Sequence, residues 1–366
     1  MAGDQDALAL AERILGILDE GGFSATYKFA LFVAILDLCI EKTKPGGAPP
    51  TTLTTRDLAL KVAELYWDHA VPYGAHGTLR QGGVRTGHQA EIVRAIEDAR
   101  AAWADGQSDT FHRARLRDAV EFARLIDFVE WKLIEMPIPR LQVLGRQEDR
   151  FLYEYNWRHD IRQAPVRAYQ HRRESDFDNR LLLLPGVAEQ LVRLNGLLRP
   201  LFHREWAVMV AGMNRLPEAD LERFLFGADR TSLDAVRGPL TELQAGACFY
   251  CGLRLGGRAD VDHFIPWSRY ADDGLDNLVA AHPACNNNKR DFLASAQHVE
   301  HWVARSQDRR NDIDSIATDV AWQRDERRSR AVATAIYLRL PAATRLWRGR
   351  DDFEPADRGR LERALS

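Results

Sequence analysis

Apolar residues recur every three or four positions from Leu8 to Leu18, which predicts a first helix that ends at Gly21. Ser24 can cap a second helix that runs to about Lys42 and is apolar on nearly every side. A helix of that kind usually lies at the centre of a bundle. The start of the chain therefore predicts a helical domain built around its second helix.

The same helical spacing continues in three further segments. It predicts helices over about Thr54–His69, Gln89–Ala104 and Thr110–Glu135. The glycine-rich, mildly basic segment Val71–His88 between the first two is either a surface connection or a loop that orders on DNA phosphate, and the pattern favours the connection. We expect a helical N-terminal domain over residues 1–136.

Beyond Pro137 the apolar pattern changes to a period of two. The alternation from Phe151 to Trp157 predicts a strand, and Arg140–Leu144 is its expected partner across the intervening turn. This strand pair marks the start of a mixed region.

Helical spacing then returns. It predicts a long helix over Leu181–Met213, interrupted near Pro200, and a short one over Glu218–Phe226. From about Ile313 onward the chain is again predicted to be helical, including the positions around Leu346. The overall expectation is a mostly helical α+β protein.

An arginine-rich segment, Arg158–Arg173, follows the predicted strand. Its cations are interleaved with Tyr169 and His171, which suits contact with a phosphate backbone or with unstacked bases. A solvated face whose arginines pair with acidic neighbours such as Asp160 fits the segment equally well. The candidate nucleic-acid contacts here are Arg167, Arg172 and Arg173.

Composition adds limits to this picture. With 366 residues, the chain is expected to form two or three packing units, and 45% hydrophobic and 28% charged residues are typical of a globular protein. The net charge of −3 means that any binding of nucleic acid must use local basic patches. The longest apolar run, Phe29–Leu36, is far shorter than the roughly 20 residues that a bilayer requires. No secretion signal precedes it, so we expect a cytoplasmic protein without a membrane segment.

The four cysteines argue against a disulfide scaffold and for a metal site in a reducing compartment. Cys248 and Cys251 form one pair separated by two residues, and His282 and Cys285 form a second. Two such pairs can bring four ligands onto one tetrahedral ion, which is the arrangement of structural zinc. The sequence therefore predicts a zinc site on these four residues.

A second group in the same segment offers harder ligands. Asp262 and His263 stand at the end of a predicted strand, and Asn286 directly follows the last zinc ligand. If zinc joins the two ends of the segment, Asn286 comes close to Asp262 and His263. Carboxylate and amide oxygens suit Mg²⁺ or Mn²⁺, and a neutral imidazole can accept a proton at physiological pH.

The segment that starts at Cys248 resembles the HNH nuclease motif, a ββα-metal fold. The pieces that match are Asp262-His263 with Ile265-Pro266, Asp276-Asn277-Leu278, and Cys285-Asn286 with Lys289. The resemblance implies that His263 is the general base, that Asn277 braces the loop, and that Asp262 and Asn286 hold the catalytic Mg²⁺ or Mn²⁺. Asn287 or Asn288 could replace Asn286 if the helix begins late. Lys289 and Arg290 are candidate phosphate contacts.

The resemblance implies an HNH endonuclease that hydrolyses phosphodiester bonds in DNA, with a nuclease module at residues 241–300. A mixed region at 137–240 and a helical C-terminal segment at 301–366 complete the expected domains. Restriction or antiphage defence is the expected role. An inactive zinc-stabilised binding module and an RNA-cleaving toxin are the alternatives. DNA is the expected partner, and protein partners or a homo-oligomer stay open.

Overall fold

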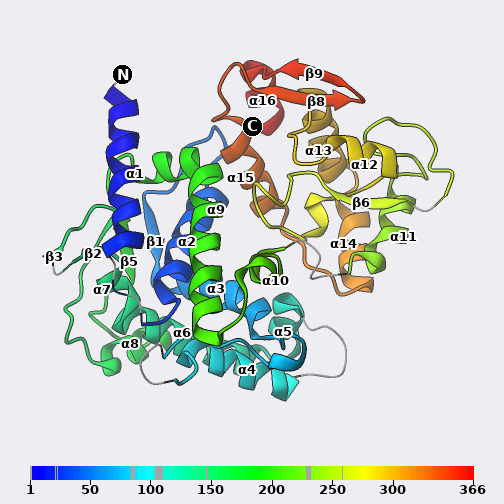
Figure 1. Ribbon diagram of the computed structural model, residues 1–366. Helices are drawn as coiled ribbons and strands as arrows, with labels where there is room; N and C mark the ends of the chain where they lie inside the picture. Colours follow the sequence, from blue (N-terminus) through cyan, green and yellow to red (C-terminus); the bar gives the residue numbers. More distant parts are fainter. Residues whose placement is uncertain are drawn as a thin grey trace. The chain divides into compact units, whose positions relative to one another are not determined.

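The computed structural model describes residues 2–20, 22, 24–83, 87–103, 110–145, 147–227, 232–257 and 259–366. The chain divides into two compact units, Met1–Cys39 with Pro50–Gly227 and Ile40–Pro49 with Ala228–Ser366. Figure 1 shows their elements. None of the described helices combines the length and the apolar character that crossing a bilayer demands.

The first unit is mostly helical, as its spacing of apolar residues predicts. Its helices are α1 (Ala2–Glu20), α2 (Tyr27–Glu41, which runs into the second unit), α3 (Thr55–Trp67), α4 (Glu91–Trp103), α5 (Phe111–Arg117), α6 (Ala119–Glu135), α7 (Pro137–Leu141), α8 (Gln163–Gln170), α9 (Val187–Asn214) and α10 (Leu221–Phe226). The predicted central helix is α2, whose residues Phe29–Leu36 are buried. Phe32 stacks on Phe202 of α9 with ring centroids 3.8 Å apart.

Two features of the predicted helices differ in the structure. The helix expected over Thr110–Glu135 is divided at Asp118, whose side chain accepts hydrogen bonds from the backbone of Val120 and Glu121 and so caps α6. The interruption expected near Pro200 is absent, because α9 continues through it. Residues 84–86 of the predicted loop and residue 104 of the predicted helix lie outside the described residues.

The strand pairing predicted for this unit was wrong. β4 (Tyr153–Tyr155) pairs with β5 (Arg180–Leu183), which also pairs with β1 (Thr52–Thr54) in an antiparallel sheet of order β1-β5-β4. The expected partner contributes only β2 (Val143–Leu144), which pairs with β3 (Gln147–Glu148). The predicted helix from Leu181 therefore begins later, at Val187.

The second unit contains a small antiparallel pair, β6 (Asp260–His263) and β7 (Leu278–Ala281), followed directly by helix α12 (Pro283–Lys289). Helix α11 (Asp234–Leu243) precedes the pair, and α13 (Ala296–Asp308), α14 (Arg310–Asp319) and α15 (Glu326–Tyr337) follow α12. A buried apolar cluster joins the strands to helices from both sides of the segment. It consists of Val236, Leu240, Leu243, Ala259, Leu275, Leu278, Ala280, Ile313 and Trp322.

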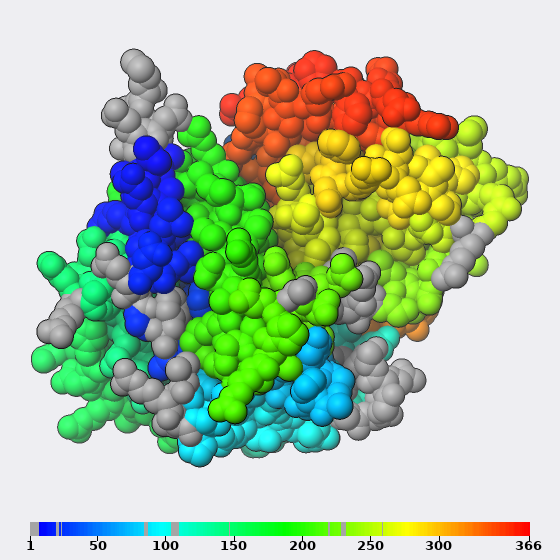
Figure 2. Space-filling view, in the orientation of Figure 1, coloured from blue at the N-terminus to red at the C-terminus, as the bar shows by residue number. Residues whose placement is uncertain are grey.

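The end of the chain contains a hairpin that the spacing of apolar residues did not predict. Leu346 lies in β8 (Arg345–Gly349), which pairs with β9 (Asp352–Pro355) before helix α16 (Arg358–Leu365). Backbone hydrogen bonds of 2.8 Å join Trp347 to Leu293 and Ser295, which lie between α12 and α13. Figure 2 shows this red terminal segment against the yellow surface of the preceding part of the unit. The hairpin supports the end of the ββα segment.

Candidate active site and metal centre

The cysteine turn, Cys248–Cys251, is closed by backbone hydrogen bonds. The amide of Gly252 donates to the carbonyl of Cys248 at 2.9 Å, and the amide of Cys248 donates to Leu253 at 2.9 Å. Gly252 has a φ of 70°, a conformation that favours glycine. The turn therefore presents both sulfurs on one side of a tight loop.

The second ligand pair comes from the start of α12. His282 is the N-cap residue of this helix and Cys285 lies in its first turn. The ligand atoms of Cys248, Cys251, His282 and Cys285 all lie within 4.8 Å of one another. This is the cluster that the sequence predicts for zinc, and its donors fit a zinc site.

The imidazole of His282 has the orientation that a metal ligand needs. Its Nε2 lies 3.1 Å from the carbonyl oxygen of Arg254, which can only accept, so the proton is on Nε2. Nδ1 is then free of its proton and lies 3.3 Å from the sulfur of Cys251. A backbone carbonyl that fixes the tautomer of a ligating histidine is a common feature of metal sites.

The pKa shifts of the thiols and the closeness of the three sulfurs are those of a cluster that favours a cation. Burial, together with the neighbouring sulfurs of Cys248 and Cys251, raises the pKa of Cys285 to about 12. Burial acts in the same direction on Cys248, but backbone N–H donors of Cys251 and His282 hold the pKa of its thiol below the ordinary value. Three sulfurs this close disfavour three thiolates unless a positive ion lies among them.

Asp262 is buried in β6, opposite Val279 of β7. Its Oδ2 accepts a 2.5 Å hydrogen bond from the hydroxyl of Tyr250 and lies 3.0 Å from the ammonium of Lys289. Burial and the Asp262 carboxylate raise the pKa of Tyr250 well above its usual value, so the hydroxyl stays a donor. Within the described residues, Oδ1 of Asp262 makes no hydrogen bond, which leaves it for a further ligand.

His263 is the last residue of β6. Its Nε2 lies 2.7 Å from Oδ1 of Asp273, and both side chains are mostly buried, with 12% and 14% of their surface exposed. The indole of Trp267 meets the imidazole edge to face at a centroid distance of 5.3 Å. The imidazole is therefore held on two sides by the loop that follows β6.

Asn277 lies buried at the end of that loop. Its side-chain oxygen accepts from the amide of Ile265 at 2.8 Å, and its nitrogen donates to the carbonyl oxygens of Ile265 and Asp272. These contacts join the two ends of the loop that carries Asp273. A role of Asn277 in bracing the loop, which the resemblance implies, stays a prediction with which these hydrogen bonds are consistent.

Asn286 projects from α12 towards β6. Its Nδ2 donates to Oδ2 of Asp260 at 3.1 Å. Asp260 and Asp262 share one face of β6, because residues two apart on a strand point the same way. One turn further along α12, Lys289 contacts Asp262. The helix thus brings Asn286 and Lys289 to the two carboxylates of β6.

Comparison with known protein families agrees with this geometry. Residues 248–295 match the HNH endonuclease family. This segment is an HNH endonuclease domain. The family consists of phosphodiester hydrolases, so the domain is that of a nuclease. No curated protein and no solved structure matches the chain.

The structure bears on the choice among the three consecutive asparagines of the HNH domain. α12 begins at Pro283, so the helix does not begin late. The side-chain oxygen of Asn288 accepts a 2.7 Å hydrogen bond from the indole of Trp347. Asn288 therefore faces the C-terminal hairpin, and Asn286 faces β6.

The two candidate phosphate contacts at the end of α12, Lys289 and Arg290, differ in burial. Lys289 is fully buried, and its ammonium also donates to the carbonyl oxygen of His263 at 2.8 Å. Burial lowers the pKa of Lys289, while Asp262 acts in the opposite direction. Its ammonium is thus directed to the protein rather than to solvent. Arg290 is exposed, with a φ of 47° at the C-cap of α12.

The arginine-rich segment lies in the first unit. Arg167 is on α8, and Arg172 and Arg173 follow that helix; all three are exposed. Tyr169 is half-buried, contacts Phe177 and accepts a hydrogen bond from Asn179 at 2.6 Å, so its ring is used in packing. Of the acidic pairs expected, the structure shows Arg158 with Asp160 at 3.4 Å.

Three residues of the site were not among the sequence candidates. Asp260 could have been found from the period of two in β6, since it shares a face with Asp262. Tyr250 lies inside the first cysteine pair, where spacing alone gives no sign of its contact with Asp262. Asp273 is ten positions from His263, and only the loop braced by Asn277 brings the two together.

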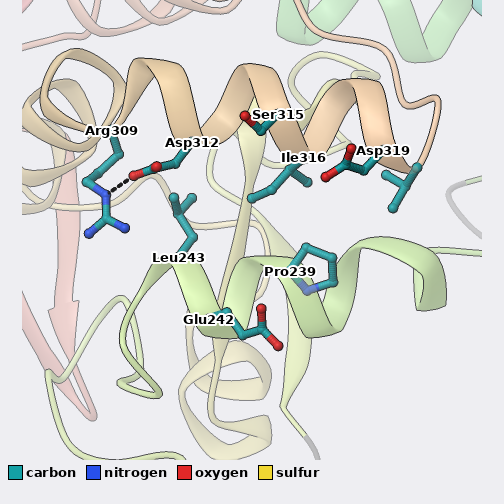
Figure 3. Close-up of a pocket in the computed structure, with 9 residues that line it drawn as sticks. Pro239, Glu242, Leu243, Arg309, Asp312, Ser315, Ile316 and Asp319 are labelled. Carbon is teal, nitrogen blue, oxygen red and sulfur yellow. Dashed lines mark hydrogen bonds and ion pairs between the residues drawn. The ribbon is translucent and has the colours of Figure 1, made fainter.

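A cavity of about 320 Å³ lies elsewhere in the second unit, between α11 and α14 (Figure 3). Its apolar wall includes Leu243 and Ile316, and its rim includes Asp312, which is paired with Arg309 at 2.5 Å. None of its lining residues belongs to the zinc cluster or to the group around Asp262 and His263.

Proposed function

We propose that the protein is a metal-dependent endonuclease that hydrolyses phosphodiester bonds in DNA. The observation that carries the proposal is the HNH domain at residues 248–295, which includes His263, Asp262 and Asn286 together with the zinc-type cluster. An enzyme of this class needs a base, a divalent ion at the phosphate and a rigid frame. Residues of the domain fit each of these requirements.

His263 is the proposed general base. Its Nε2 is engaged with Asp273, which leaves Nδ1 to take a proton from the attacking water. The water oxygen bonds to phosphorus as the bond to the leaving 3′ oxygen breaks. The side chain of His263 is 12% exposed at the end of β6.

Asp262 and Asn286 are the proposed ligands of the catalytic ion, Mg²⁺ or Mn²⁺. Each offers an oxygen that makes no hydrogen bond within the described residues, and oxygen donors suit these hard ions. Bound there, the ion would supply positive charge to the phosphate and to the leaving oxygen. Tyr250 and Lys289 hold the other oxygen of Asp262 and so fix the direction of its carboxylate.

Zinc on Cys248, Cys251, His282 and Cys285 is the proposed frame. It would join the cysteine turn to α12, and α12 carries Asn286 and Lys289. Zinc with four protein ligands has no open position for substrate, so its contribution is to folding.

DNA is the proposed substrate, and restriction or antiphage defence is the proposed role. The size of the rest of the chain supports this role over that of a free RNA-cleaving toxin. The matched segment covers residues 248–295 of 366, so most of the protein is available to recognise a target before cutting. Exposed arginines at Arg167, Arg172 and Arg173 are the proposed contacts to phosphate.

The test is direct. Zinc-loaded protein is incubated with Mg²⁺ or Mn²⁺ and with plasmid DNA, phage DNA, single-stranded DNA or RNA, beside the His263→Ala variant. We expect cutting of a DNA substrate that depends on the added ion and is roughly 10²–10⁴-fold slower in the variant. Cutting of RNA alone would overturn the DNA assignment, and no cutting of any substrate would overturn the nuclease proposal.

A further inference from the structure

The imidazole of His263 has a carboxylate partner inside the HNH domain. Nε2 of His263 and Oδ1 of Asp273 are 2.7 Å apart, a short and well-formed hydrogen bond. An ionised carboxylate can only accept hydrogen bonds. The proton in this contact is therefore carried by Nε2, which in the neutral ring leaves Nδ1 with a free lone pair.

Asp273 is itself held firmly. Its backbone carbonyl accepts a 2.7 Å hydrogen bond from the indole of Trp322. Its two neighbours in the chain are also held. The amide of Gly274 donates to Oδ1 of Asp272 at 2.9 Å, and the side chain of Asn277 donates to the backbone carbonyl of Asp272 at 3.0 Å. A carboxylate on a fixed backbone can restrict the ring that it contacts.

The side chains beside Asp273 do not compete for His263. Asp272 faces the other way, where Oδ1 lies 2.8 Å from the guanidinium of Arg328 and Oδ2 accepts from the hydroxyl of Ser329. The two adjacent carboxylates thus have separate partners, one on α15 and one on the imidazole. Asp273 is the acidic residue of this loop that acts on His263.

We propose that Asp273 is a positioning residue that fixes both the orientation and the tautomer of His263. The inference rests on the proposed role of His263 as the base, since it says which ring nitrogen takes the proton of water. A carboxylate on the second ring nitrogen holds the imidazole in one tautomer and one orientation. In serine hydrolases an aspartate has this role, and its replacement by asparagine leaves the histidine in the wrong tautomer.

The tautomer can be measured without any reaction. The full-length, zinc-loaded protein is labelled with ¹⁵N in its histidine rings, and long-range ¹H–¹⁵N spectra are recorded at a pH where the rings are neutral. Protonated and unprotonated ring nitrogens have well-separated ¹⁵N shifts. Comparison with His263→Ala assigns the signals of His263 among the 11 histidines.

We expect wild-type His263 to be protonated on Nε2 alone. In Asp273→Asn, the amide can donate as well as accept, so both tautomers should be populated and the two ¹⁵N shifts should move towards each other. Asp351→Asn is the matched control, because Asp351 is an exposed carboxylate in the turn of the β8–β9 hairpin. It should leave the His263 signals unchanged.

Kinetics give a second measurement on the same variants. Asp273→Asn should lower kcat by at least about tenfold and by no more than the roughly 10²–10⁴-fold that the base itself supplies, with KM unchanged. A residue that only supported the fold would lower the melting temperature or zinc content, without a change of tautomer in the protein that stays folded.

Three results are decisive. Protonation of Nε2 in the wild type and disappearance of that preference in Asp273→Asn support the inference. A wild-type His263 protonated on Nδ1, or an unchanged tautomer in Asp273→Asn, overturns it. If the wild type cuts no substrate, the proposed function fails, and the ¹⁵N spectra still decide whether Asp273 sets the state of His263.

Discussion

A single carboxylate, that of Asp262, connects the zinc-type cluster to the group proposed for chemistry. Its Oδ2 contacts Tyr250, which lies between Cys248 and Cys251, and Lys289, which ends α12. Both elements that carry zinc ligands therefore also place this carboxylate. At the scale of residues, a substitution of a zinc ligand should therefore alter the position of the Asp262 carboxylate through its contacts with Tyr250 and Lys289.

The His263→Ala variant tests the proposed chemistry. It should fold, hold zinc and bind DNA, because neither the zinc ligands nor the proposed ion ligands change. Turnover should fall by roughly 10²–10⁴-fold. Asp262→Ala and Asn286→Ala should instead bind the catalytic ion less tightly, so excess Mn²⁺ should restore part of their activity. Asn277→Ala should lower the turnover less than the other substitutions do. Cutting by His263→Ala at the wild-type rate would show that another group is the base.

Lys289→Met separates the buried contact from a phosphate contact. The substitution keeps the volume of the side chain but removes the ammonium that faces Asp262, and removing one partner of a buried ion pair costs about 3 kcal/mol or more. We expect a lower free energy of unfolding in urea. Arg290→Met is the control, and its stability should equal that of the wild type because Arg290 is exposed. An unchanged stability of Lys289→Met would favour the phosphate contact that the sequence predicts.

His298 predicts a dependence of stability on pH. Burial, and the nearby His301, lower its pKa, and its Nε2 lies 3.1 Å from the carbonyl oxygen of Tyr250. Below the ordinary histidine pKa of about 6.5, the unfolded chain binds a proton that the folded chain does not, so the free energy of unfolding falls as the pH falls. Above that value this histidine gives no slope.

The measurement is thermal or urea unfolding of the wild type and of His298→Gln between about pH 7.5 and about pH 5.5. Release of zinc in acid affects both proteins, so the difference between their slopes isolates His298. The wild type should lose more stability, by up to about 1.4 kcal/mol per pH unit. Parallel curves would contradict the expectation.

At the scale of elements, β6 and α12, which carry the site residues, were more predictable from the sequence than the strands β5 and β8. The mostly helical α+β class is confirmed, and the strand that ends in Asp262-His263 and the helix that carries Cys285 and Asn286 follow from motif and spacing. β5 was missed because four consecutive leucines hide its alternation, in which Leu182 is exposed and Leu181 and Leu183 are buried. β8 is short and follows a helix, so its few apolar positions fit both the spacing of a helix and the period of two of a strand.

Disruption of the zinc-type cluster should affect a whole element. Cys251→Ala removes one of four ligands, so α12 loses its tie to the cysteine turn, and a closed zinc site contributes directly to folding. We expect a protein with less zinc, measured by elemental analysis, and with a lower melting temperature. Cys39→Ala is the matched control, since Cys39 is a buried cysteine of the first unit and should leave the zinc content unchanged. Wild-type protein purified without chelator that contains no zinc would refute the assignment.

At the scale of the whole molecule, the chemistry occupies a small part of a slightly acidic chain. The structure divides near residue 227, and the HNH domain lies entirely in the second unit. The four regions expected from the sequence stay a prediction. With a net charge of −3, the protein has no overall attraction to DNA, so local cations must supply it. The exposed arginines of the first unit are the proposed source of these cations.

Three of these arginines are the proposed contacts to the DNA backbone. Arg167, Arg172 and Arg173 are exposed, and they follow one another along α8 and the residues after it. Replacing all three with glutamine should weaken DNA binding and reduce the slope of log Kd against log salt concentration by about 0.9 for each phosphate that an arginine no longer neutralises. The measurement is a salt titration of binding in the His263→Ala background, where no DNA is cut.

The matched control replaces Arg115, Arg117 and Arg124 with glutamine, because these exposed arginines belong to the same unit and their replacement changes the net charge equally. If general charge governed binding, both triple variants would bind DNA less tightly to the same degree. If Arg167, Arg172 and Arg173 contact phosphate, only their replacement should flatten the salt dependence, and it should do so equally for every DNA sequence, since phosphate contacts carry no base information. A wild-type slope in that variant would assign the segment to a solvated face, whose arginines pair with acidic neighbours as Arg158 does with Asp160.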